Sequence, residues 1–120
     1  MSEAEEILRG ARTVLLVDWP SPDVPEALRA AGYEVVVKNG PGPDDFNPAR
    51  PERVVLVYVH RPASELPAIV ALAAELGARA VWCQTPSGEA RAAVEAAGLT
   101  YAGEPSIVAA VRGLTGGGAR

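Results

Sequence analysis

The 120-residue sequence is poor in cysteine, lysine and histidine, and each shortage excludes a class of protein. Cys83 is the only cysteine, so no intrachain disulfide can form, and no Cys/His cluster offers a zinc site. Lys38 is the only lysine and the net charge is −4, which argues against a nucleic-acid or anionic-membrane partner. No apolar run approaches the roughly 18 residues of a membrane span. With an acidic N-terminus unlike a signal peptide, these features predict a cytoplasmic protein.

Glycine and proline are abundant instead, with 12 glycines and 11 prolines beside a hydrophobic content of 48%. The two residues together average about 12% of protein sequences, so this chain has many turns for its size. Its hydrophobic content is enough for a core of valine, leucine and alanine, which excludes general disorder. The length suits one domain, which we predict over residues 1–113, followed by a flexible tail over residues 114–120.

Short β-branched apolar runs recur along the chain and predict strands. The first run is continuous rather than alternating, which indicates a strand buried on both faces. The predicted strands cover residues 13–18, 33–38, 54–59, 80–83 and 99–102. Segments with helical spacing lie before, between and after these strands. They predict a helix at residues 2–12, another that Ser64 caps and Gly77 ends, and a last one at residues 105–112. Residues 39–52 have no period and predict an irregular loop.

One local pattern recurs where predicted helices end. Gly32, Gly77 and Gly98 each follow a helical segment, and a strand begins one or two residues later. Glycine suits the left-handed position at a helix C-terminus, and such short joints belong to strand–helix–strand units. These units need right-handed crossovers onto a parallel sheet. The sequence therefore predicts an α/β fold of three layers with about five parallel strands.

In such a sheet, ligands bind beyond the carboxyl ends of the strands, near the point where the strand order reverses. Polar and loop-forming residues follow each predicted strand and nominate a site there. The candidate binding residues are Asp18, Trp19, Ser21, Lys38, Asn39, His60, Arg61, Pro62 and Gln84.

Several of these residues have two interpretations. Asp18 is a turn former or a ligand for ribose or a cation, and Ser21 is a helix cap or a phosphate contact. Arg61 can pair with a phosphate or with a carboxylate of the protein itself, and Lys38 can meet a phosphate or remain solvated. Trp19 in its loop suggests a contact surface for adenine or for another protein.

Other residues favour structural roles. Trp82 and Cys83 lie in a buried run, where they are core residues rather than a contact surface and a reactive thiol. His60 is the only histidine, and no serine or cysteine partner can be argued for it. The sequence offers no nucleophile–base pair, metal constellation or phosphate loop, so we expect no catalytic activity.

The chain resembles stand-alone CoA-binding domains, the Rossmann-like module that also forms the N-terminal half of the succinyl-CoA synthetase α subunit. The resemblance covers about residues 4 to 112 and is most specific at Arg61-Pro62 and Val81-Trp-Cys-Gln84. It is also carried by LRAAGYEVVV at residues 28–37 and EAAGL at residues 95–99. The resemblance implies a Rossmann-like fold that binds CoA or another adenine nucleotide, with Arg61 and Lys38 offsetting phosphate charge.

The segment after the first strand departs from that family's pattern. Family members usually have a glycine, a small residue and a serine there, whereas this chain has Asp18-Trp19. A carboxylate at this point would repel the CoA diphosphate. An alternative is therefore a family member that has lost the ligand and serves as a protein-interaction module, as a homodimer. A third hypothesis is a receiver-like domain, but His60 and Gly103 stand where it needs a phospho-acceptor aspartate and a lysine.

Overall fold

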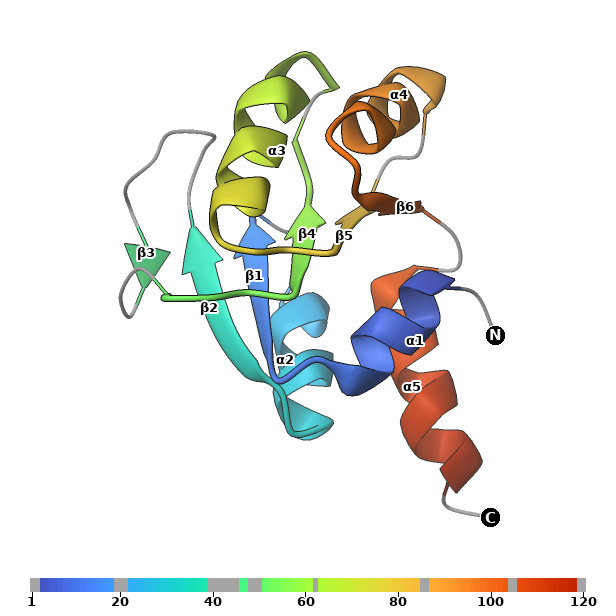
Figure 1. The fold of residues 1–120 in the computed structure, drawn as a ribbon. Coiled ribbons are helices and arrows are strands. Elements are labelled where there is room, and N and C mark those ends of the chain that lie inside the picture. The colour runs from blue at the N-terminus through green and yellow to red at the C-terminus, as the bar shows by residue number, and fades with distance from the viewer. Residues whose placement is uncertain are drawn as a thin grey trace.

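The computed structural model describes residues 3–18, 22–38, 46–47, 51–61, 63–84, 87–103 and 106–118. Strands and helices alternate along most of the chain (Figure 1). The strands are β1 (Thr13–Val17), β2 (Glu34–Lys38), β3 (Phe46–Asn47), β4 (Leu56–Val59), β5 (Ala80–Cys83) and β6 (Thr100–Ala102). The helices are α1 (Glu3–Gly10), α2 (Asp23–Ala30), α3 (Leu66–Glu75), α4 (Gly88–Ala96) and α5 (Ile107–Gly118), with a 3-10 turn η1 (Ala63–Glu65) before α3.

The strands form one sheet in the order β3-β2-β1-β4-β5-β6. All five predicted strands are present and pair parallel with one another, which confirms the predicted α/β class. The edge strand β3 is the exception, because it pairs antiparallel with β2 inside the segment that we predicted as an irregular loop. The pairing involves only Phe46 and Asn47, which is too short for any period to show in the sequence.

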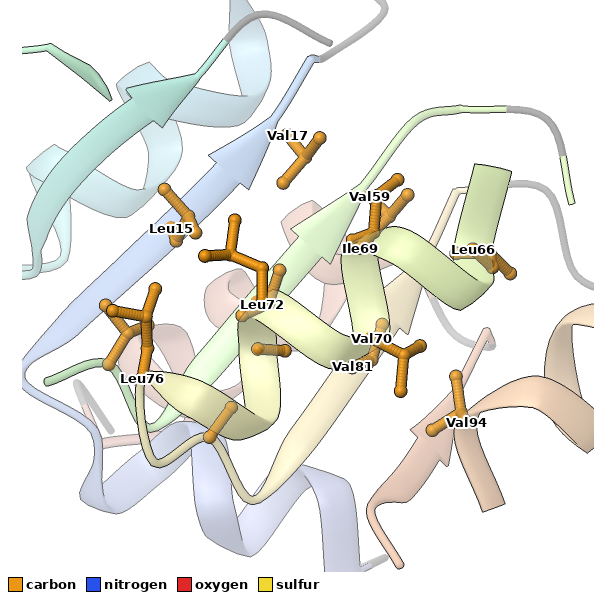
Figure 2. Close-up of a cluster of buried hydrophobic side chains, with 14 of the residues drawn as sticks. Leu15, Val17, Val59, Leu66, Ile69, Val70, Leu72, Leu76, Val81 and Val94 are labelled. Atoms are coloured by element: carbon orange, nitrogen blue, oxygen red, sulfur yellow. The ribbon is translucent and has the colours of Figure 1, made fainter. Parts of the chain in front are cut away.

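Two helical layers cover the sheet. Helices α3 and α4 pack on one face, and α1, α2 and α5 pack on the other (Figure 1). Alternate residues of β1 serve the two layers: Leu15 and Val17 join the first cluster, whereas Val14 and Leu16 join the second. Figure 2 shows the first cluster, where side chains of α3 meet those of β1, β4 and β5. The prediction that the first strand is buried on both faces is therefore confirmed.

The three predicted glycine joints are confirmed and share one geometry. Gly32, Gly77 and Gly98 have φ values of +95°, +81° and +79°, the left-handed region that glycine adopts without strain. After α3, the Gly77 amide donates to the Ala74 carbonyl at 3.0 Å and the Ala78 amide donates to the Ala73 carbonyl at 2.9 Å. These two bonds make a Schellman motif, which satisfies carbonyls at the helix end.

The same pair of bonds closes the other two helices. After α2, the amides of residues 32 and 33 donate to the carbonyls of residues 29 and 28, each at 3.0 Å. After α4, the amides of residues 98 and 99 donate to the carbonyls of residues 95 and 94 at 3.0 and 3.3 Å. Each joint thus turns the chain straight into the following strand.

The prediction that Ser64 caps α3 is wrong. Ser64 lies inside η1, and α3 has Glu65 at its N-cap with no side-chain capping bond. The Glu65 carboxylate is instead engaged by Arg61. Among the described serines, two cap helices: the Ser87 hydroxyl accepts from the Ala90 amide at 3.0 Å, and the Ser106 hydroxyl accepts from the Ala109 amide at 3.2 Å.

Helix α5 also differs from expectation. It begins at Ile107 and runs to Gly118, past the end at Arg112 that we predicted. Glycine lowers helix propensity by about 1 kcal/mol without forbidding the conformation. Pro105 lies outside the described residues, and the flexibility of residues 114–120 stays a prediction. In the part of the chain that the structure describes, no helix has the length and apolarity that crossing a bilayer requires.

Candidate functional site

The carboxyl ends of β1 and β4 form the switch point of the sheet. The chain leaves β1 for β2 on one side, and later returns to place β4 on the other side of β1. Ligands of open α/β sheets bind in the crevice at such a point. Asp18 directly follows β1, and His60 and Arg61 directly follow β4. Three of the predicted site residues therefore stand at the switch point.

Arg61 is held between two carboxylates there. Its Nη1 donates to Asp18 Oδ2 at 3.1 Å across the switch point. Its Nε and Nη2 donate to Glu65 Oε1 at 3.0 and 2.8 Å, and Nη2 also reaches Glu65 Oε2 at 2.8 Å. The hydrogen bonds to Glu65, together with the charges of both carboxylates, raise the pKa of Arg61. Of the two partners that we considered for Arg61, the structure shows the protein's own carboxylates.

Asp18 adopts an unusual backbone conformation. Its φ of +58° is the only positive value among the described residues other than glycine. Aspartate tolerates this left-handed region better than most residues, though less well than glycine. The Asp18 amide donates to the Lys38 carbonyl at 3.0 Å, which ties the turn to the end of β2. Asp18 therefore leaves the extended conformation directly after β1, and both interpretations of its role, turn former and ligand for ribose or a cation, stay predictions.

The backbone amides at this edge are engaged within the sheet. The amide of His60 donates to the Val17 carbonyl at 3.0 Å, and that of Gln84 donates to the Val59 carbonyl at 2.8 Å. These bonds continue the parallel ladder by one residue past each strand and fix the edge. Among the described residues, His60 Nδ1 is a buried polar atom without a hydrogen-bond partner.

Lys38 is buried, with a relative exposure of 1%, so the expectation of a solvated lysine is wrong. It is the last residue of β2 and belongs to the face covered by α3 and α4. Its Nζ lies 5.2 Å from the centroid of the Phe46 ring, where a cation is attracted to the ring face. Phe46 was missed by sequence reasoning, although a lone aromatic residue in a glycine- and proline-rich loop could have drawn attention to it.

Gln84 contacts the core cluster under α1, α2 and α5. Its Oε1 accepts a hydrogen bond from the hydroxyl of Tyr58, a fully buried residue of β4. Burial, and to a lesser extent the charge of Cys83, raises the pKa of Tyr58. Tyr58 packs with α1, α2 and α5, on the opposite face from Lys38. The structure thus brings Asp18 and Arg61 together, and Gln84 points to a different layer.

The remaining candidates divide into core residues and residues outside the description. Trp82 and Cys83 are buried, which confirms their predicted place in the core. Burial raises the pKa of the Cys83 thiol to about 11, so this cysteine stays protonated near neutral pH. No three histidine, cysteine or acidic side chains in the described ranges are placed to hold a metal ion. The predicted residues Trp19, Ser21, Asn39 and Pro62 lie outside the described residues.

Glu65 is the partner that sequence reasoning missed. It lies four residues after Arg61, and a charge pair at this spacing is a known signal on helices. The predicted helix starts at the Ser64 cap and leaves Arg61 outside it, so helical spacing did not indicate this pair. Together Asp18, Arg61 and Glu65 form what we call the arginine clamp.

Solved structures share this architecture. A protein from Thermus thermophilus aligns with a TM-score of 0.67 and 20% identity, over 93% of this chain and 96% of its own. A conserved hypothetical protein from Pyrococcus furiosus aligns with a TM-score of 0.60 and 21% identity, over 82% and 97% of the two chains. At these identities the likeness shows the fold alone. No curated protein matches the chain.

An orphan response regulator of H. pylori aligns more loosely, with a TM-score of 0.50 and 19% identity over 89% of this chain and 96% of its own. This likeness again shows only the fold. A receiver site would need an aspartate after β4 and a lysine after β6, where the structure has His60 and Gly103.

The family is shown by a match to a family model. The model of the CoA binding domain matches residues 15–112, which include the last three residues of β1, all of β2 to β6 and the switch-point residues Asp18, His60 and Arg61. This match bears out the resemblance seen in the sequence, which covered nearly the same residues. The chain belongs to the CoA-binding domain family.

Proposed function

We propose that this protein binds CoA or another adenine nucleotide without catalysing a reaction on it. The observation that carries the proposal is the position of Arg61, a guanidinium at the switch point of a chain that belongs to the CoA-binding domain family. Guanidinium groups form strong, bidentate hydrogen bonds with phosphate. The ligand would lie beyond the carboxyl ends of β1, β2 and β4, where open α/β sheets bind nucleotides.

The residues at this edge fit a nucleotide in part. Arg61 supplies donors for phosphate, and Lys38 adds a positive charge at the end of β2 beside Phe46. Adenine would lie against apolar loop residues between the second and third predicted strands. The Asp18 carboxylate opposes a diphosphate, because it adds a negative charge 3.1 Å from the arginine that the phosphate needs. The fit therefore favours a binding site with modest affinity for phosphate.

The absence of catalysis is supported by the chemistry of the edge. The clamp residues are paired with one another, and Cys83 is a buried, protonated thiol. His60 has no hydroxyl or thiol hydrogen-bonded to it among the described residues. These observations support binding alone, with CoA as the proposed small-molecule partner.

Isothermal titration tests the proposal. The protein is titrated with CoA, an acyl-CoA, NAD and ATP up to millimolar concentration, and melting shifts are recorded with the same ligands. We expect at least one to bind, and Arg61→Gln to weaken that binding about tenfold or more through the loss of charge-assisted hydrogen bonds.

A matched control is available on α4. Arg91 pairs with Glu95 at the same four-residue spacing as Arg61 with Glu65, and lies over the Tyr101 ring of β6, two strands from the switch point. Arg91→Gln removes an equivalent charge and should leave binding unchanged. No heat and no melting shift with any of the four ligands would contradict the proposal and favour the alternative of an interaction module.

A further inference from the structure

The two carboxylates of the arginine clamp hold Arg61 in different ways. Glu65 lies on the same segment and accepts from both Nε and Nη2, in three contacts of 2.8 to 3.0 Å. Asp18 comes from the end of β1 and accepts from Nη1 in a single contact of 3.1 Å. Glu65 therefore orients the guanidinium, and Asp18 occupies the nitrogen that faces β1 across the switch point.

An anionic ligand at the switch point needs the same nitrogen. Arg61 offers five N–H groups in a rigid plane, and the contacts with Glu65 use the Nε and Nη2 side of that plane. A phosphate arriving in the crevice between β1 and β4 would therefore bind through Nη1. Asp18 already takes one of the two Nη1 hydrogens, so a phosphate that engages both must displace the carboxylate, and one that engages the other binds beside its negative charge.

We propose that Asp18 is a specificity-determining residue of the ligand site, because it competes with ligand phosphate for Arg61 Nη1. The inference rests on the proposed function. It adds a selectivity that the family does not imply: Asp18 weakens the binding of phosphate-bearing ligands and leaves that of a neutral nucleoside unchanged. Since both side chains are only about one-quarter to one-third exposed, at 25% and 32%, solvent screens the competition incompletely.

The variant Asp18→Asn tests this competition directly. Asparagine has nearly the same shape, tolerates a φ of +58°, and carries no charge. We expect Asp18→Asn to bind CoA and ADP about fivefold more tightly, since a partly exposed ion pair is worth up to about 1 kcal/mol. The affinity for adenosine should not change. Asp18→Gly, which also suits the backbone, should give the same gain and guards against an effect of the new amide.

The dependence on Arg61 separates competition from simple repulsion. In an Arg61→Gln background, Asp18→Asn should produce no gain, because no guanidinium remains to be released. The matched control is Glu95→Gln, which removes the carboxylate of the Arg91 pair and should leave all affinities unchanged. Titration calorimetry of the four proteins with CoA, ADP and adenosine supplies the cycle.

The outcomes are distinguishable from those of the proposed function. If wild type binds CoA and Asp18→Asn shows no gain, an equal gain for adenosine, or a full gain without Arg61, the competition is overturned and the proposed function stands. If only Asp18→Asn binds, the competition is supported and the native chain loses the proposed function. If neither protein binds any ligand at millimolar concentration, both proposals are overturned.

Discussion

The two edges of the parallel sheet are built in different ways. At the amino edge, three helices enter strands through the same Schellman motif, with a glycine at positive φ each time. At the carboxyl edge, each strand exits differently: β1 into a left-handed aspartate, β4 into the arginine clamp, and β5 into a glutamine bound by Tyr58. The joints at the amino edge satisfy backbone hydrogen-bonding groups, whereas the carboxyl edge places different side chains after each strand.

The two edges also differ in which residues adopt the left-handed backbone conformation. The left-handed conformation falls on glycine at all three amino-edge joints, where it costs nothing. At the carboxyl edge it falls on Asp18, which has a side chain. A non-glycine residue in this region is uncommon and suggests a function, and here the side chain reaches Arg61. Three predictions test how far the two edges differ.

The largest effect is expected from high pH at the carboxyl end of β5. Burial raises the pKa of Cys83 from 9.0 to about 11, so the folded state binds the thiol proton more tightly than the unfolded chain does. That stability is fully present below pH 9 and is lost as the pH rises towards 11. We expect wild type to lose about 2 kcal/mol relative to Cys83→Ala between pH 8 and pH 11, measured by urea denaturation.

The difference between the two proteins is the informative quantity, because Tyr33 and Tyr58 also have raised pKa values and contribute in both. The burial that raises both pKa values is common to wild type and variant and cancels in the difference, whereas the smaller contribution of the Cys83 charge to the pKa of Tyr58 is part of the Cys83 effect. Parallel stability curves for the two proteins would show that Cys83 is not the buried thiol that the structure describes.

A smaller effect is expected at the amino edge. Gly77→Ala and Gly98→Ala should each cost about 1 to 2 kcal/mol of unfolding free energy, because alanine is strained at positive φ. At Gly98 an added Cβ meets nothing within 4 Å, and at Gly77 it meets only the flexible side chain of Arg53, with Nε at 3.3 Å. The two costs should therefore be similar, as measured by urea denaturation.

Gly113 provides the control for these substitutions. It lies inside α5 with open space around an added Cβ and without a positive φ. Gly113→Ala should therefore stabilise the protein by about 0.5 to 1 kcal/mol through helix propensity. Equal destabilisation at Gly113 and Gly98 would mean that backbone conformation does not explain the joints.

The smallest effect is expected at Asp18. Asp18→Gly loses the ion pair with Arg61 but relieves the backbone, so its unfolding free energy should stay within about 0.5 kcal/mol of wild type. Asp18→Ala loses the pair and keeps a Cβ at a φ of +58°, and should cost about 1 kcal/mol. Thermal melting of the two variants together with Asp18→Asn, which removes the charge pair and keeps a side chain that tolerates this φ, checks the order. A glycine variant less stable than the alanine variant would contradict it.

The local features of the fold could be predicted because each depends on neighbours in the chain. The continuous apolar run of β1 predicted burial on both faces, and each glycine joint combined a helix end, a turn and a strand start within five residues. The start of α3 was predicted wrongly, because residue type alone does not show where a helix begins. Ser64 has the residue type of a cap, but it lies inside η1, and the N-cap position falls on Glu65, whose carboxylate pairs with Arg61.

For the site, the sequence predicted the location but not the contacts of the side chains. The carboxyl edge follows from a parallel sheet, and so Asp18 and Arg61 were expected near one another. Their hydrogen bond was not predicted, because the two residues are 43 positions apart and an arginine donates to phosphate as well as to carboxylate. Gln84 was assigned to the same site, yet its side chain meets Tyr58 on the other layer.

By itself, the sequence determined the α/β class, the five parallel strands and the joints between helix and strand, since periodicity and turn chemistry act over a few residues. Only the tertiary structure decided that the single lysine is buried over Phe46, that β3 pairs with β2, and that Arg61 is clamped between two carboxylates. Apart from the Arg61–Glu65 pair, these contacts join segments that are separated in the chain. They depend on which residues the folded sheet brings close together, and local sequence patterns do not predict that proximity.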